Sequence, residues 1–248
     1  MNEQQSIEYW MSSLRHKWKE VPGAVSDRHK TNELFNLSGK DLLEFWIATR
    51  NRDTTGARFP VRGWYHELYK DILRGKKVLE VGSGLGIDGI TFAQHGAHVT
   101  FVDIVETNLK VVQRVCSLLN LNNTVFHYME TIASLELLDA NYDAVWAQGS
   151  LINAPFKIIQ EEVHEILKHL KQNGRWIELA YPESRWKREG CMPFDKWGER
   201  TDGAGTPWVE WYDLNKMKAL FNPINFDVVL YFEFHNNDFN WFDLLIQK

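Results

Sequence analysis

The stretch Val78-Leu-Glu-Val-Gly-Ser-Gly-Leu-Gly86 decides the fold. It begins with a short apolar run, typical of a buried strand, and continues into glycines spaced as GxGxG. Gly82 and Gly84 permit a tight turn and the close approach of a ligand, because glycine has no Cβ. Residues 87–94 predict a helix, whose N-terminus presents free N–H groups and a positive potential. The stretch therefore predicts a strand, a ligand-binding loop and a helix.

Asp103 extends this interpretation. It ends the next predicted strand, 98–102, and lies 17 positions after Gly86. A carboxylate at that point can accept hydrogen bonds from both hydroxyls of a ribose. Together the two features predict an adenosine-containing cofactor. Two plainer explanations stay open: turn glycines of any α/β protein, and an Asp103 that caps the following helix.

Strands and helices alternate from residue 77 onward, which predicts a parallel sheet with helices on both faces. The predicted strands are 78–81, 98–102, 124–128, 142–147 and 175–180, and the predicted helices are 87–94, 108–119, 156–170 and 214–221. Asn173-Gly174 is interpreted as the stop signal of the third helix. Two last strands, 226–234 and 240–246, are joined by so short a connection that they must be antiparallel.

Two segments lie outside this alternation. Residues 1–75 predict a helical cap with a loop over 50–63, and residues 76–248 the main domain. Residues 182–211 form an insertion after the fifth strand without clear periodicity, and we expect it to be a lid. Each of the two segments holds four of the eleven tryptophans, so we expect cap and lid to meet as an aromatic-walled pocket.

Composition excludes several classes of protein. A net charge of −5 without a basic tail argues against nucleic-acid binding. The two cysteines, Cys116 and Cys191, form no zinc-binding spacing, so we expect no metal site and a reducing compartment. The sequence shows neither an apolar run long enough for a membrane span nor a secretory leader. We therefore expect a cytoplasmic protein with a small-molecule partner.

The motif Glu80-Val-Gly-Ser-Gly-Leu-Gly86, with Asp103 and the closing hairpin, resembles class I S-adenosylmethionine-dependent methyltransferases over about residues 78–248. The resemblance implies an α/β, Rossmann-like fold with a seven-stranded sheet of order 3-2-1-4-5-7-6 and an antiparallel last strand. It also implies S-adenosylmethionine as the cofactor. By this resemblance, the residues that hold its amino acid part are Glu80, Gly82, Ser83, Gly84 and Gly86.

The same resemblance assigns the rest of the cofactor. It places Asp103 at the ribose, Ile104 against adenine and Glu130 near the adenine amine. Gln148 matches the stretch beside the methionine portion. For Glu130 the alternative is a cap of the next helix. Because N-terminal segments of the family commonly fold over the cofactor, we also hypothesise that Arg62 or Trp64 covers the methionine end.

The acceptor is expected beyond the carboxyl ends of the strands. Transfer to oxygen, which we favour over nitrogen, needs a general base. His235 is the first candidate because its unperturbed pKa lies near neutrality, Tyr181 is a candidate orienting group, and His66 is a further option. Each has a plainer alternative. His235 can be a histidine bonded locally in a hairpin turn, Tyr181 an aromatic residue in the wall of the pocket, and His66 a histidine on a helix surface.

The insertion mixes cations with its tryptophans, among them Arg185, Lys187, Arg188 and Arg200. We interpret them as a site for a small anionic acceptor that carries phosphate or carboxylate, such as a nucleotide-linked sugar or a surface-polysaccharide precursor. The alternative is a solvated mixture of charges, because acids are interspersed. Two other functions stay open: an NAD(P)-binding oxidoreductase, which the GxGxG spacing and the closing hairpin disfavour, and an inactive cofactor-binding partner subunit.

Overall fold

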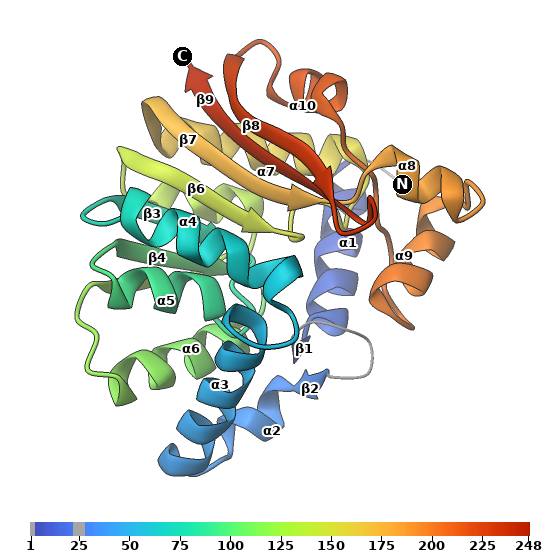
Figure 1. Ribbon diagram of the computed structural model, residues 1–248. Helices are drawn as coiled ribbons and strands as arrows, with labels where there is room; N and C mark the ends of the chain where they lie inside the picture. Colours follow the sequence, from blue (N-terminus) through green and yellow to red (C-terminus); the bar gives the residue numbers. More distant parts are fainter. Residues whose placement is uncertain (1–2, 22–27) are drawn as a thin grey trace. The chain divides into compact units, whose positions relative to one another are not determined.

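The computed structural model describes residues 3–21 and 28–248 (Figure 1). The chain divides into two compact units. The glycine-loop unit is Trp18–Tyr128, and the hairpin unit consists of helix α1 (Glu3–Lys17) and Met129–Lys248. This division does not coincide with the predicted segments 1–75 and 76–248, which stay a prediction.

The glycine-loop unit holds three parallel strands in the order β5-β4-β3. They are β3 (Lys77–Val81), β4 (His98–Asp103) and β5 (Thr124–Tyr128), connected by α5 (Ile87–Gln94) and α6 (Glu106–Leu118). Val78 and Leu79 of β3 are fully buried, as expected of a parallel strand covered by helices. The short apolar runs of the sequence therefore become the strands of this unit.

The N-terminal part of this unit corrects one prediction. Its elements are β1 (Glu20–Val21), β2 (His29–Lys30), α2 (Thr31–Phe35), α3 (Gly39–Thr54), η2 (Phe59–Gly63) and α4 (Trp64–Ile72). The loop predicted over 50–63 is wrong, because α3 continues to Thr54 and η2 is a π-helical turn. A Cβ on Gly63 would lie 2.3 Å from the Thr54 carbonyl oxygen, so this turn packs against the end of α3.

The hairpin unit holds four strands in the order β6-β7-β9-β8. They are β6 (Tyr142–Gln148), β7 (Leu170–Ala180), β8 (Asn225–Phe234) and β9 (Phe239–Gln247). Strand β6 is parallel to β7, whereas β9 is antiparallel to both β7 and β8. Across the seven-stranded sheet the order is β5-β4-β3-β6-β7-β9-β8, which confirms the predicted order and its antiparallel last strand.

The predicted helix stop at Asn173-Gly174 is wrong. Helix α7 (Phe156–His169) ends at His169, and β7 begins with the next residue. Asn173 has a φ of 57° inside the range of β7, where the pairing with β6 shifts register. The two residues therefore bend a strand, because asparagine tolerates the left-handed conformation in either context.

The insertion has more regular structure than its sequence indicates. It contains α8 (Glu183–Arg188) and α9 (Phe194–Asp202), and α10 (Leu214–Phe221) follows it; a short 3₁₀ helix, η3 (Ile132–Leu137), completes the unit. The ring of Phe194 packs against Trp186, Trp197 and Trp208 at centroid distances of 5.7, 6.4 and 5.4 Å. Trp10 of α1 meets Trp208 at 5.6 Å. Most tryptophans of the insertion therefore form its own small core.

Within the described residues, no helix has the length and apolarity that crossing a membrane requires.

Two of the buried carboxyl groups of the hairpin unit, Glu178 and Glu162, have a raised pKa. Glu178 on β7 is fully buried, and its Oε2 accepts a hydrogen bond of 2.7 Å from the indole N–H of Trp176. Burial raises the pKa of Glu178 to about 8 and that of Glu162, on α7, to about 7. Both groups therefore favour the protonated form inside the fold.

We expect the free energy of unfolding to fall as the pH rises from about 4.5, the ordinary pKa of a glutamate, to about 8, the pKa of Glu178 in the fold. A carboxyl whose pKa is higher in the folded chain stabilises the fold below its unfolded pKa, and this contribution is lost as the pH rises through 7 to 8. Each pKa unit is worth about 1.4 kcal/mol. Glu178→Gln should raise the urea midpoint at pH 9, whereas Glu161→Gln, on the exposed face of α7, should not. Equal midpoints for both variants at pH 9 would contradict this account.

Candidate functional site

The glycine loop joins β3 to α5 in a conformation that needs glycine. Gly84 and Gly86 have φ values of 53° and 62°, and a Cβ on Gly86 would lie 2.8 Å from Val112. The hydroxyl of Ser83 and the N–H of Gly82 both donate to the Val102 carbonyl, at 3.2 and 2.8 Å. The loop is thus fixed to the end of β4.

Asp103 lies against this loop at the end of β4 and is 4% exposed. Its Oδ2 accepts from the N–H of Gly84 at 3.0 Å, and its Oδ1 from the N–H of Val105 at 2.7 Å. Burial raises the pKa of Asp103 to about 6, although these donors oppose the shift. Val105 is the N-cap of α6, so the explanation of Asp103 as a helix cap is wrong. Ile104, between them, is half-buried.

Asn108 is a residue of this site that sequence reasoning missed. It lies in the first turn of α6, is 1% exposed, and its Nδ2 is 3.3 and 3.2 Å from the two carboxylate oxygens of Asp103. Its neighbours on the buried face of α6 include Leu109, Val112 and Val115. The sequence carried one signal for Asn108: it is a polar residue on a helix face that is otherwise apolar, and a buried polar side chain needs a hydrogen-bond partner.

Glu80, near the end of β3, is 5% exposed and lies beside Gly89 of α5. A Cβ on Gly89 would come within 2.1 Å of Glu80 Oε2, so only glycine leaves room for this carboxyl. That Oε2 is buried and has no hydrogen-bond partner. Burial is the main cause that raises the pKa of Glu80 well above its ordinary range, and the charge of Asp88 adds to the rise. The N–H of Gly89 and the charge of Arg62 oppose it.

Arg62 and His66 both meet buried acids in the glycine-loop unit. The Nε of Arg62 donates to the Tyr65 hydroxyl at 3.0 Å, and its other nitrogens lie 3.6 Å from Asp53 and 3.9 Å from Asp88. His66 Nε2 is 2.9 Å from the second oxygen of Asp88. His66 is 3% exposed, so the alternative of a helix-surface histidine is wrong. The positive charge of Arg62 therefore compensates the charges of two buried carboxylates, Asp53 and Asp88. That Arg62 covers the methionine end of the cofactor stays a prediction.

Two of the predicted cofactor residues lie in the hairpin unit. Gln148 ends β6, and both its side-chain nitrogen and its side-chain oxygen are buried without a hydrogen-bond partner. Glu130 is exposed, and its backbone carbonyl accepts from Arg15 of α1. Thr131 caps η3 by accepting from the N–H of Ser134, so the explanation of Glu130 as a helix cap is wrong.

Tyr181 and His235 lie on either side of Phe239 in the hairpin unit, at centroid distances of 5.8 and 6.0 Å. The Tyr181 hydroxyl donates to Asp202 at 2.9 Å, and the guanidinium of Arg185 lies 4.3 Å above its ring. Burial raises the pKa of Tyr181 above its ordinary value, so its hydroxyl keeps the proton. His235 is exposed in the hairpin turn with a φ of 53°.

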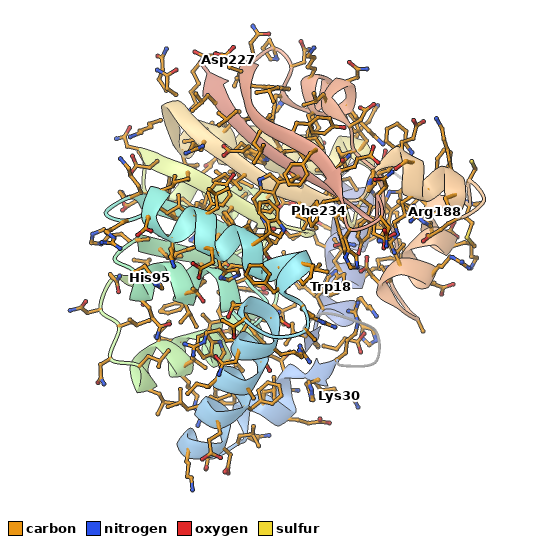
Figure 2. All side chains as sticks on the ribbon, in the orientation of Figure 1. Trp18, Lys30, His95, Arg188, Asp227 and Phe234 are labelled. Atoms are coloured by element: carbon orange, nitrogen blue, oxygen red, sulfur yellow. The ribbon has the colours of Figure 1, made fainter. Side chains whose placement is uncertain are left out.

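The four cations that suggested an anion site are all paired with acids of the same unit. Figure 2 shows Arg188 on α8, beside the turn that follows Phe234, where it pairs with Asp238. The other pairs are Arg185–Glu189 at 3.1 Å, Lys187–Glu183 at 2.7 Å and Arg200–Glu189 at 3.8 Å. The alternative of a mixed-charge surface therefore describes the insertion better than a cationic pocket.

Arg62→Ala should destabilise the fold. Removing one partner of a buried ion pair costs about 3–5 kcal/mol, and the 22% exposure of Arg62 places the expected loss near the lower end. The control Arg74→Ala, in an exposed pair with Asp71, should cost under about 1 kcal/mol. Urea unfolding at pH 7 measures both. A loss for Arg62→Ala no larger than for Arg74→Ala would rule out charge compensation.

The site residues fit the cofactor that the sequence indicates. In the glycine-loop unit, Gly84 and Gly86 hold the loop in a left-handed conformation, Asp103 adjoins it, and Glu80 Oε2 is buried without a hydrogen-bond partner. In the hairpin unit, the side-chain amide of Gln148 is also buried without a partner. These are polar groups that a ligand with an amino acid part and a ribose can satisfy.

Comparison with known proteins agrees with this geometry. Residues 78–174 match a family described as a methyltransferase domain. A ubiquinone biosynthesis O-methyltransferase from Idiomarina loihiensis is 48% identical over 54 residues, which are 22% of each chain. The match thus spans about a fifth of that curated relative's length.

Two solved structures share the fold. Magnesium protoporphyrin IX methyltransferase from Synechocystis PCC 6803, with bound S-adenosylhomocysteine, has a TM-score of 0.57 at 15% identity and full coverage of both chains. The 1,6-didemethyltoxoflavin-N1-methyltransferase from Burkholderia thailandensis has a TM-score of 0.55 at 16% identity, covering 92% of this chain and 94% of its own. The chain therefore shares its fold with these methyltransferase structures, and residues 78–174 match the methyltransferase-domain family.

Proposed function

We propose that this protein transfers a methyl group from S-adenosylmethionine to an oxygen atom of a small molecule. The observation that carries the proposal is Asp103, a buried carboxylate held against the glycine loop by the N–H of Gly84. When bound, the cofactor supplies a methyl group already activated by its sulfonium. The protein then has to bind it, align the acceptor and exclude water.

The proposed cofactor contacts follow the position of each residue. Asp103 accepts from the ribose hydroxyls, and Ile104 and Glu130 adjoin adenine. The amino acid part is held by Glu80, Gly82, Ser83, Gly84 and Gly86, and Gln148 offers its unpartnered amide beside the methionine portion. Nicotinamide cofactors suit this loop less well, because its glycines follow GxGxG spacing and the sheet closes with an antiparallel hairpin.

The proposed acceptor site lies in the hairpin unit. Tyr181 donates its one hydroxyl hydrogen to Asp202, so we propose that its oxygen orients the acceptor by accepting a hydrogen bond, and His235 is the proposed base. His66 is buried and bonded to Asp88, so we assign it to supporting that acid and not to proton transfer. The paired cations of the insertion do not support an anionic acceptor. We therefore propose an uncharged hydroxyl compound ahead of a nucleotide-linked sugar or polysaccharide precursor.

Methyl transfer can be tested by mass spectrometry of S-adenosylhomocysteine formed from the cofactor and a panel of hydroxyl, amine and sugar-nucleotide acceptors. We expect turnover with a hydroxyl compound. General-base catalysis is worth about 10²–10⁴-fold, so His235→Ala should lower kcat by at least about a hundredfold without changing cofactor affinity. Tyr181→Phe should lower kcat about tenfold, the loss of one hydrogen bond. Cofactor binding without turnover on any acceptor would favour an inactive partner subunit.

Cofactor affinity should depend on the charge of Asp103. With a pKa of about 6, the carboxylate loses acceptor capacity as the pH falls, so S-adenosylhomocysteine affinity should drop as the pH falls through 6. Hydrogen bonds to charged groups are worth about 1.5–3 kcal/mol, so Asp103→Asn should weaken binding at least about tenfold at pH 7.5. Calorimetry measures both effects, and Asp227→Asn on β8 is the control that should keep the wild-type profile. Unchanged affinity in Asp103→Asn would refute the ribose assignment.

A further inference from the structure

Asn108 joins the proposed ribose-binding carboxylate to the N-terminal segment of the same unit. Its Nδ2 is within 3.3 Å of both oxygens of Asp103 and 3.1 Å from the Trp18 carbonyl oxygen. Its Oδ1 is 2.9 Å from the Thr31 hydroxyl. An amide has two N–H donors and one carbonyl acceptor, so every polar atom of this buried side chain has a partner.

Chemistry fixes the orientation of the Asn108 amide. An ionised carboxylate and a backbone carbonyl only accept hydrogen bonds, so the NH₂ group must face Asp103 and Trp18. The amide oxygen then faces the Thr31 hydroxyl, which has one hydrogen to give. The same hydroxyl also donates to the Lys19 carbonyl at 2.5 Å, so its single hydrogen is shared between that carbonyl and Asn108.

The N-terminal segment reaches the glycine loop at the same corner. Strands β1 and β2 pair antiparallel, with Val21 opposite His29. A Cβ placed on Gly84 would be 3.8 Å from a methyl group of Val21, so this side chain lies over the loop. Gly84 is the residue whose N–H donates to Asp103, so the loop, the carboxylate and the segment that begins at Trp18 meet around one amide.

We propose that Asn108 is a positioning residue that orients Asp103 for the cofactor ribose and fastens the N-terminal segment beside it. The three donors on Asp103 use part of a carboxylate that can accept about four hydrogen bonds, and the remaining capacity is directed at the ligand. This inference rests on the proposed function. It adds a residue that acts through Asp103, the Trp18 carbonyl and the Thr31 hydroxyl, without touching the reacting atoms.

The test is calorimetric titration of S-adenosylhomocysteine from pH 5 to pH 8.5 on the full chain. Asn108→Ala should weaken binding about tenfold at pH 7.5, the loss of a charge-assisted hydrogen bond. It should also move the midpoint of the pH profile upward, because Asp103 loses a donor that favours its ionised form. A purely structural role would lower affinity by the same factor at every pH.

Matched variants separate the possible causes. Thr31→Val removes the hydroxyl shared by the amide oxygen and the Lys19 carbonyl but keeps Asn108, and it should give a smaller shift in the same direction, which keeps the test valid where Asn108→Ala fails to fold. Ser117→Ala, on the exposed side of α6, should match the wild type. Glu80, on the adjacent strand β3, interacts with the charges of Asp88, Arg62 and, most weakly, Asp103, so the Asn108 shift should persist in a Glu80→Gln background.

Failure of the two proposals can be told apart. A wild-type protein that binds no S-adenosylhomocysteine would overturn the proposed function and this inference together. A wild type that binds, with Asn108→Ala and Thr31→Val showing the wild-type pH midpoint, would overturn the role of Asn108 alone.

Discussion

The glycine-loop unit depends on one buried charge, the carboxylate of Asp103. Taking a carboxylate out of water is costly unless donors replace the lost water, and here the donors come from the glycine loop, the start of the following turn and the first turn of α6. Satisfying one side chain therefore fixes three backbone segments relative to one another. The same side chain that organises the unit in the absence of a ligand is the one proposed to bind the ribose.

A second group of buried charges organises the N-terminal part of the same unit. Asp53 is fully buried beside Arg52, Arg58 and Arg62, and Arg62 continues to Asp88. These polar residues made the segment 50–63 resemble a solvent-exposed loop. In the fold they neutralise each other inside a helical turn, so polarity there indicates an internal ion-pair network.

Elements defined by local sequence were predicted well, and those defined by distant partners were not. The bounds of α5, β5 and α10 agree with the prediction, because each is a short apolar or amphipathic run ended by a turn signal. The motif around Gly84 and the position of Asp103 were identified from spacing alone. Asn108 and the His66–Asp88 pair were missed for the same reason. Asp88 lies 22 positions from His66, and Trp18 lies 90 positions from Asn108, so the local sequence shows neither contact.

The insertion shows why a list of residue types overstates binding chemistry. Arginines beside tryptophans suggest an anion site, but a cation already paired with a carboxylate has little net attraction left for a ligand. Arg185 and Arg188 instead bind the β8–β9 turn, so they connect α8 to the hairpin on which His235 lies. Their contribution to catalysis is then geometric. In the proposed reaction, methyl transfer from an activated donor depends chiefly on alignment, which a hydrogen-bonded Tyr181 and a turn connected to α8 would favour.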